Sequence, residues 1–458
     1  MMENKKINKV PGLLVFLCLL LLSSCSEFVE VDLPASQLPS QIIFEDPATA
    51  RAAMSSIYGN MRDNGFLSGN LPGLSCVLGL YTDELDFYRQ DIDYFYTNSL
   101  FAAQPAIKSY WNHGYSLIFA ANAVIEGVRN SQSLPAELKA QLEGEALFVR
   151  ALVHLYLNQL YGGVPYVTTT DYTVNGNVSR LPPIEVLQLI RQDLLDAASF
   201  LPDNPSVERV LPSKGAARSL LARTCLYAGW WDEAVLHSTA VIEGPLYQWV
   251  DDPAAVFLNN STATIWQFMP ADASLNTLEG DLFIFEVGPP PAIAISASLY
   301  NAFEIGDLRR SGWIREVTDG TDSWYHAFKY KQRTISGAST EYSILLRLAE
   351  QYLIRAEARA MTGNIEGAKA DLNKVRQRAG LPDTDATDAM EIVNAVMAER
   401  RVELFTEFGH RFFDLQRTGS LDEALENIKP GWDSTDRLWP IPSDEIVINP
   451  NITQNPGY

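Results

Sequence analysis

The sequence predicts an all-α protein whose scaffold consists of tetratricopeptide-like helix pairs and carries a loop-rich region with short β-hairpins. The clearest helix covers residues 344–361, where apolar side chains recur on one face with a 3.6-residue period. Gly363 ends this helix, and Asn364 caps the next one, which covers residues 365–379. A helix, a glycine and a second helix in this order are typical of a structure built by stacking helix pairs.

A second helix pair upstream repeats this pattern. When Gly229 is aligned with Gly363, three further pairs of small or apolar residues fall into line: Ala222 with Ala356, Ala234 with Ala368, and Val241 with Val375. Small side chains at these positions allow two antiparallel helices to approach closely. The segment 145–162 has the composition of the first helix in a third pair, so we expect a helical-repeat scaffold.

The chain begins with an export signal. Three lysines precede the apolar run 13–22, which ends in Leu22-Ser23-Ser24-Cys25. A basic segment, a short apolar segment and small residues before the cleavage site are typical of a secretory signal peptide, and the cysteine resembles the lipobox of bacterial lipoproteins. We therefore expect residues 1–24 to be removed and Cys25 to be acylated. The alternative is an ordinary secretory signal in which Cys25 has no role.

A tether and an N-terminal helical region follow the signal. Residues 25–45 form an acidic, extended tether, and residues 46–244 form the helical region, which starts with Asp46 as a helix cap before Pro47. Its expected helices cover residues 47–62, 106–130, 136–161, 184–201, 214–229 and 232–243.

The rest of the chain divides into two regions. Residues 245–342 contain several prolines and two β-favouring runs, 264–268 and 282–287. We expect this region to form loops and short hairpins over the helices and to carry the ligand contacts. Residues 343–458 form a C-terminal helical region whose last segment, 438–458, is extended and pinned across the body.

The composition excludes several functions. The chain has 458 residues and a formal net charge of −21, which becomes −23 when residues 1–24, with three Lys and one Glu, are removed. Such an acidic chain does not bind nucleic acid or dock electrostatically on anionic lipid, so its membrane contact would come from acylated Cys25 alone. Beyond residue 25 only Cys76 and Cys225 are present, too few for a disulfide framework or a zinc site.

No catalytic motif is present. The five histidines are scattered, and the sequence lacks the common zinc, phosphate-binding and nucleophile motifs. Asp83, Glu84 and Asp86 form the densest acidic cluster, but a glycosidase needs two carboxylates that face each other, so a solvated acidic loop or a helix start explains them better. We expect a protein that is not an enzyme and holds no cofactor or metal. A loop Ca²⁺ site built from carbonyl groups would leave no sequence pattern.

The segment 399–419 alternates charged residues with phenylalanines. Glu399 and Glu403 fall on one helical face, and three more charged residues follow at similar spacing. Charged side chains that are partly buried among aromatic rings persist when they are paired. We therefore expect a structural ion-pair network in this segment.

The candidate ligand-binding residues are aromatic side chains in predicted loops, together with a polar neighbour. Sugar rings present C–H faces that stack on aromatic planes, and their hydroxyl groups need polar side chains beside those planes. The alternative for each ring is that it anchors a loop to the scaffold. The candidates are Tyr81, Asp83, Tyr94, Tyr96, Trp266, Trp313, Trp324 and Tyr325.

Several strings in the C-terminal third carry a family resemblance. They are Arg347-Leu348-Ala349-Glu350-Gln351-Tyr352-Leu353, Glu399-Arg400-Arg401-Val402-Glu403-Leu404, Arg411-Phe412-Phe413-Asp414-Leu415-Gln416-Arg417 and the closing Gln454-Asn455-Pro456-Gly457-Tyr458. Together with Cys25, Tyr161-Gly162-Gly163-Val164-Pro165 and Asp307-Leu308-Arg309, they resemble the SusD/RagB family of surface glycan-binding lipoproteins of Bacteroidetes. The resemblance spans essentially the whole chain.

The resemblance implies a protein on the outer surface of the outer membrane that captures an oligosaccharide without cleaving it. It also implies a partner, a SusC-like TonB-dependent transporter over which the protein sits as a lid, and attachment to outer-membrane lipid through acylated Cys25. The family's shared motifs belong to the scaffold, so they do not indicate the ligand-binding residues. Three alternatives remain: the same lid with peptide cargo, an exported glycoside hydrolase that uses Asp83 and Glu84, and a periplasmic helical-repeat scaffold.

Overall fold

The computed structural model describes residues 40–333 and 337–458. The predicted signal peptide, Cys25 and most of the predicted tether lie outside the described residues. Within these residues the protein is predominantly helical, with three two-stranded sheets, so the predicted fold class is confirmed.

The helices and strands have the following bounds. The helices up to residue 242 are α2 (Ser40–Ile43), α3 (Pro47–Asp63), α4 (Leu74–Tyr81), α5 (Pro105–Asn130), α6 (Ala136–Tyr161), α7 (Tyr172–Asn175), α8 (Pro183–Phe200), α9 (Lys214–Ala228) and α10 (Trp231–Ile242). The later helices are α11 (Leu278–Phe283), α12 (Ala297–Tyr300), α13 (Leu308–Trp313), α14 (Leu348–Met361), α15 (Ile365–Arg378), α16 (Ala389–Glu403), α17 (His410–Thr418), α18 (Leu421–Leu425) and α19 (Ser443–Ile448). The strands are β1 (Leu85–Phe87), β2 (Thr264–Phe268), β3 (Ile293–Ile295), β4 (Ile314–Thr318), β5 (Ser323–Ala327) and β6 (Ser343–Arg347).

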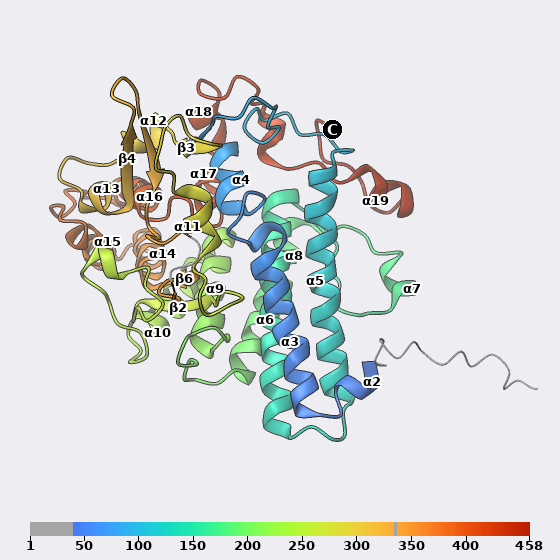
Figure 1. Ribbon diagram of the computed structural model, residues 1–458. Coiled ribbons are helices and arrows are strands. Elements are labelled where there is room, and N and C mark those ends of the chain that lie inside the picture. The colour runs from blue at the N-terminus through green and yellow to red at the C-terminus, as the bar shows by residue number, and fades with distance from the viewer. Residues whose placement is uncertain (1–39, 334–336) are drawn as a thin grey trace, which may run out of the picture.

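The helix pairs stack as the sequence predicts. α9 packs against α10, α14 packs against α15, and α10 lies against α14. Gly229 and Gly363 follow the first helix of each pair with φ of 70° and 84°, a backbone conformation that residues with a Cβ disfavour. The alanines and valines that align between the two pairs are all buried. α6 and α8 pack together as the predicted third pair. The long helices α3 and α5 run side by side with α6 (Figure 1).

Local cap signals place the helix ends correctly. Asp46 accepts hydrogen bonds from the backbone N–H groups of Ala48 and Thr49 at 2.8 and 3.2 Å, and Pro47 is the first residue of α3. α6 covers the predicted residues 136–161, and the other helices predicted before residue 244 begin and end within one residue of their predicted bounds. These ends depend on neighbouring residues alone, which is why the sequence predicts them.

The helix predicted over residues 344–361 is wrong at its start. Residues 343–347 form β6, and α14 begins only at Leu348. All five residues of β6 are buried, and the strand pairs antiparallel with β2. A short apolar run fits both a helix and a buried strand, so the partner strand β2 decides between them.

The loop-rich region contains one strand where the sequence predicts it and lacks another. β2 covers the predicted residues 264–268. The second β-favouring run, 282–287, is not a strand, because α11 continues to Phe283 and no strand begins before β3. Thr277 caps α11 by accepting a hydrogen bond from the backbone N–H of Gly280, and this local cap favours the helix.

The predicted ion-pair network lies in the core between α13, β6, α15 and α16. Glu403 is fully buried and accepts hydrogen bonds from three arginine side chains: Arg309, Arg347 and Arg378. Although burial alone would raise the pKa of Glu403, these arginines hold it well below its ordinary value. The charges in this segment therefore hold the scaffold together, as predicted.

The C-terminal segment is pinned across the body, as predicted, but it contains the helix α19. Trp439 and Ile441 are fully buried. Asn455 Nδ2 donates hydrogen bonds to the carbonyl oxygens of Tyr161 and Trp439 at 2.9 and 2.7 Å. The end of the chain is thus tied to the end of α6.

Candidate ligand-binding face

Two half-buried tyrosines that stack on each other, Tyr300 and Tyr325, lie on one small unit, which we call the β cap. It consists of β1, β3, α12, α13 and the β4–β5 hairpin, and most of it is at the upper left of Figure 1. β1 pairs antiparallel with β3, β4 pairs with β5, and β3 lies against β5. Their inner sides cover a core that includes Leu85, Ile293 and Trp313. The outer side of the β cap therefore rests on a fixed base.

An acidic segment between α4 and β1 fastens the β cap to the helices. Asp83 accepts hydrogen bonds from Arg401 of α16 at 2.6 Å and from Arg411 of α17 at 2.9 and 3.0 Å. The backbone N–H of Ser296, just before α12, donates to the carbonyl oxygen of Glu84 at 2.9 Å. Asp83 and Glu84 are only 3% and 2% exposed. The prediction of a solvated acidic loop or a helix start is therefore wrong, as is the prediction that Asp83 contacts a ligand.

The two buried carboxyl groups differ in charge. Burial alone would raise the pKa of Asp83, but Arg411 and Arg401 hold it below its ordinary value. Burial and the neighbouring Asp83 raise the pKa of Glu84 to about 7. Glu84 Oε1 has no hydrogen-bond partner among the described residues. Asp83 is thus a charged anchor and Glu84 a weak acid, and neither faces a glycosidic bond at the surface as a hydrolase would require.

A stack of three side chains stands on the outer side of the β cap. The rings of Tyr300, at the end of α12, and Tyr325, in β5, lie face to face with centroids 3.8 Å apart and 20° between their planes. The guanidinium carbon of Arg310 lies 4.1 Å from the centroid of the Tyr300 ring, within the range of a cation–π contact. An open hollow of about 380 Å³ lies beside the stack, and Ser311 and Glu316 also line it. This volume is typical of small-ligand sites.

The hollow combines aromatic rings with hydrogen-bonding groups. Arg310 is half-buried and forms no ion pair within the described part of the chain. Glu316 lies opposite Tyr325 in the β4–β5 register, so both side chains face the same side of the hairpin. The hydrogen bond with Tyr300 and burial raise the pKa of Tyr325 to about 12, so its phenol is neutral at physiological pH. An aromatic plane beside a guanidinium and a carboxylate suits a sugar ring with its hydroxyl groups.

A second aromatic group lies on the loop between β1 and α5. Lys429 Nζ lies 3.9 Å from the centroid of the Tyr96 ring and donates a hydrogen bond to the carbonyl oxygen of Leu80 at 2.7 Å. The Tyr96 hydroxyl lies 3.5 Å from Asp86 Oδ1. Burial lowers the pKa of Lys429 to about 8 and raises the pKa of Asp86. Tyr94, on the same loop, is 38% exposed, so this group offers a second aromatic surface.

Three predicted candidates are structural residues. Tyr81 ends α4, Trp266 lies in β2, and Trp313 ends α13. Each donates its hydroxyl or indole hydrogen to a backbone carbonyl, at 2.9, 3.2 and 3.0 Å respectively. All three are fully buried, so the prediction that they form a ligand platform in loops is wrong. Large aromatic residues with a buried hydrogen-bond partner are core residues, and the sequence does not reveal that partner.

Trp324 and Tyr325 do not form one platform. They are consecutive residues of β5, so their side chains point to opposite sides of the hairpin. Trp324 packs against a small cluster that includes Phe285, and its indole lies against the backbone of Gly288. Of the predicted candidates, Tyr94, Tyr96 and Tyr325 are thus the ones that the structure brings to the outer surface near the β cap.

Sequence reasoning missed Tyr300, Arg310 and Lys429. Tyr300 meets Tyr325 because β3 lies against β5, and Arg310 joins them from α13, which runs directly into β4. One signal was available: two adjacent arginines, Arg309 and Arg310, follow the helix cap Asp307. Adjacent residues on a short helix point in different directions, so one of the two is free to face outward.

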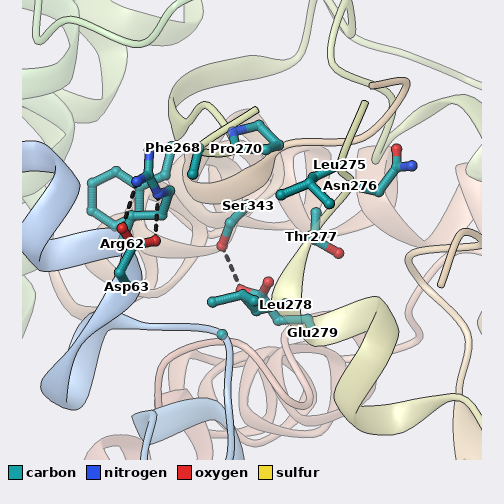
Figure 2. Close-up of a pocket in the computed structure, with 12 residues that line it drawn as sticks. Arg62, Asp63, Phe268, Pro270, Leu275, Asn276, Thr277, Leu278, Glu279 and Ser343 are labelled. Atoms are coloured by element: carbon teal, nitrogen blue, oxygen red, sulfur yellow. Dashed lines mark hydrogen bonds and ion pairs between the residues drawn. The ribbon is translucent and has the colours of Figure 1, made fainter. Parts of the chain in front are cut away.

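A separate small cavity lies between α3 and α11 (Figure 2). It encloses about 60 Å³, which is enough for a few water molecules but not for a sugar ring. Ser343 Oγ donates to Glu279 Oε1, whereas Glu279 Oε2 has no partner in the described residues. Burial raises the pKa of Glu279. Figure 2 also shows the ion pair between Arg62 and Asp63 on the other side of this cavity.

Other chemical features of residues 40–333 and 337–458 are limited. No helix there is long and apolar enough to cross a membrane. No group of three His, Cys, Asp or Glu residues in these ranges is arranged to hold a metal ion. Cys76 and Cys225 are free, buried thiols.

Two family models match the chain. The model described as the SusD family matches residues 308–458, and the one described as "Starch-binding associating with outer membrane" matches residues 81–226. Among curated relatives, SusD-like protein P2 of Formosa agariphila is 27% identical over 512 residues, which covers 97% of this chain and 99% of that relative. SusD-like protein P38 of the same organism is 24% identical over 513 residues and covers 97% and 98%.

Solved structures share the fold. A SusD superfamily protein from Bacteroides vulgatus has a TM-score of 0.78 at 21% identity, and the match covers 90% of this chain and 99% of that protein's chain. A laminarin-binding SusD-like protein has a TM-score of 0.77 at 24% identity, and the match covers 90% of this chain and 99% of that protein's chain. At these identities the likeness establishes the fold.

Proposed function

Because the chain belongs to the SusD family, we propose that it captures an oligosaccharide on the β cap and delivers it to a SusC-like TonB-dependent transporter. The observation that carries the proposal is the stack of Arg310, Tyr300 and Tyr325 beside a hollow of about 380 Å³. Association of the family with starch binding and the outer membrane supports it.

Binding in this proposal needs no chemical step. A sugar ring stacks its C–H face on Tyr325, and Arg310 and Glu316 form hydrogen bonds with its hydroxyl groups. The aromatic surface around Tyr96 holds a further unit of the chain. Asp83 has no part in binding, because its carboxylate is engaged by two arginines at the base of the β cap.

Acylation of Cys25 would keep the protein at the cell surface beside its transporter. One acyl chain gives only reversible membrane binding, so stable attachment requires more than one. Mass spectrometry of the membrane-extracted protein tests this step, because acylation adds mass to an N-terminal peptide that begins at Cys25.

Isothermal titration calorimetry against a panel of plant, algal and microbial glycans tests the ligand. We expect binding to at least one glycan and an affinity at least ten-fold lower for Tyr325→Ala. Phe200→Ala is the matched control, because Phe200 is an exposed aromatic residue at the end of α8, away from the β cap. A panel without any binding would contradict the proposal.

Peptide cargo is the second candidate, because carboxylates flank both aromatic groups. Asp86 lies beside Tyr96, and Glu316 lies beside Tyr325, and such pairs also suit lysine or arginine side chains. A mixture of basic peptides in the same calorimetric panel distinguishes the two cargoes. Repeating the titrations with a calcium chelator tests whether a loop Ca²⁺ ion takes part.

A further inference from the structure

Exposed apolar side chains gather along one side of the molecule, away from the β cap. Tyr172 of α7 is 83% exposed, Val447 and Ile448 of α19 are 84% and 73% exposed, and Phe119 of α5 is 52% exposed. In Figure 1, α7 and α19 both project beyond α5 at the right, on the side where α2 begins the described chain. Contiguous exposed apolar surface of this kind is typical of a protein–protein contact.

A continuous groove runs between these projections. One hollow of about 660 Å³ lies between α5, α7 and α19, and another of about 620 Å³ continues it towards α2. Phe119 and Thr170 line both hollows, so the two form one groove. Its floor on α5 extends from Trp111 to Asn130, about 28 Å at 1.5 Å per residue. An extended segment of several residues fits this length.

The groove also contains polar groups that suit a peptide backbone. Asn175 Nδ2 donates to the carbonyl oxygen of Thr169 at 2.8 Å, but its buried Oδ1 has no hydrogen-bond partner among the described residues. Asn112 and Ser116 are exposed on the floor. Three carboxylates line the groove: Glu45, Glu126, which accepts hydrogen bonds from Thr170, and Glu445, whose pKa is raised by burial. An uncharged or apolar loop is therefore a better fit than an acidic one.

The position of the groove indicates which partner it meets. Cys25 precedes Ser40 by 15 residues, so an acylated Cys25 lies within about 50 Å of the start of α2 even if the chain between them is fully extended. α2 packs against α5, and Phe44 lies against Gly127 at the lower end of the groove. One end of the groove thus lies beside α2, the first described element after the expected acylation site, and an acyl anchor there would hold a membrane-embedded partner at high local concentration.

We propose that the groove between α7 and α19 is the docking surface for the outer-membrane transporter, and that it takes an apolar extracellular loop of that transporter. The inference rests on the proposed function, because it requires that the partner is a TonB-dependent transporter. It goes further in assigning the contact to α5, α7 and α19 and leaving the β cap free for the ligand.

Affinity purification from detergent-solubilised outer membranes tests the assignment. A tagged wild-type protein is expected to retain a TonB-dependent transporter, identified by mass spectrometry, and Tyr172→Asp combined with Ile448→Asp is expected to reduce that yield at least ten-fold. Leu236→Asp is the matched control, because Leu236 is an exposed apolar residue on α10, away from the groove. Both changed side chains are largely exposed, so the double variant is expected to fold, which circular dichroism melting checks.

Calorimetry on the same variants separates this inference from the proposed function. Unchanged glycan affinity together with a lost transporter supports the docking surface. An undiminished transporter yield, an equal loss for Leu236→Asp, or a loss of glycan affinity with the transporter retained would each overturn it, as would a dimer that the double variant converts to monomer. A wild-type protein that retains no transporter would refute the proposed delivery step itself.

Discussion

Arg309 and Arg310 are neighbours in α13, but their side chains face two different regions of the molecule. Arg309 is fully buried in the helical core and forms ion pairs at 2.5–3.0 Å with three carboxylates: Asp307, Glu399 and Glu403. Arg310 is on the outer side of the β cap, where it stacks on Tyr300 and forms no ion pair among the described residues. The core satisfies its charges internally, whereas the β cap leaves groups ready for a ligand.

The same contrast applies to the aromatic residues. Trp266 and Trp313 are fully buried, and each uses its indole N–H on a backbone carbonyl. Tyr300 and Tyr325 are half-buried and stack on each other beside a hollow. Residue type therefore does not distinguish scaffold residues from site residues in this chain. Burial and completed hydrogen bonds distinguish them.

The largest effect on stability is expected for a substitution in the core. Arg309→Met removes a buried guanidinium that three buried carboxylates share, which should lower the free energy of unfolding by about 3–5 kcal/mol. Arg310→Met removes no ion pair and should change it by less than about 0.5 kcal/mol. Chemical denaturation monitored by circular dichroism measures both. Equal effects of the two substitutions would contradict the division between core and β cap.

A pH dependence is expected where the two regions join. Burial raises the pKa of Glu84 from 4.5 to about 7. The stability that comes from protonated Glu84 is therefore fully present below pH 4.5 and is lost as the pH rises through 7. Glu84→Gln cannot ionise, so it should gain up to about 3 kcal/mol over the wild type between pH 4.5 and 8. Unfolding free energies of both proteins at several pH values measure this gain. A pH-independent difference would show that the pKa of Glu84 is the same in the folded and unfolded states.

The next largest effect is expected on glycan affinity, and it tests the role of the β cap. Tyr300→Ala and Tyr325→Ala should each weaken glycan binding about ten-fold, or about 1.4 kcal/mol, because each removes one ring of the stack. Arg310→Ala should weaken it as well, while all three variants keep a wild-type unfolding transition. Titration calorimetry together with thermal melting measures both quantities. Wild-type affinity in all three variants would place the ligand elsewhere.

The smallest effect is expected for a buried polar group that serves neither role. Glu279 lines the small cavity of Figure 2, and its pKa is raised by burial. Glu279→Gln keeps its size and should leave glycan affinity unchanged within two-fold. If its affinity fell as far as that of Tyr325→Ala, a cavity of about 60 Å³ would have to influence the ligand-binding face.

The sequence predicts the features that depend on neighbouring residues. The cap at Asp46, the glycine after α9 and the bounds of α6 follow from local preferences. The charge and phenylalanine pattern of residues 399–419 also indicates the ion-pair network correctly. The resemblance to the SusD family rests on strings that lie mostly in this scaffold, and the SusD family model matches residues 308–458.

The candidate site is less predictable because it depends on contacts between distant segments. β6 becomes a strand only through β2, and Tyr300 meets Tyr325 only because β3 lies against β5. Burial of Trp266 and Trp313 comes from partners that are far away in the sequence. The sequence predicts Tyr325 as a candidate, but only the structure shows that it stacks on Tyr300.

A crystal structure with the best-binding oligosaccharide of the calorimetric panel tests the central claim most directly. The account predicts a sugar ring stacked within about 4 Å of Tyr325, with its hydroxyl groups bonded to Arg310 or Glu316 and the groove between α7 and α19 empty of sugar. An oligosaccharide bound in that groove, or anywhere else with Tyr325 uncovered, would contradict it.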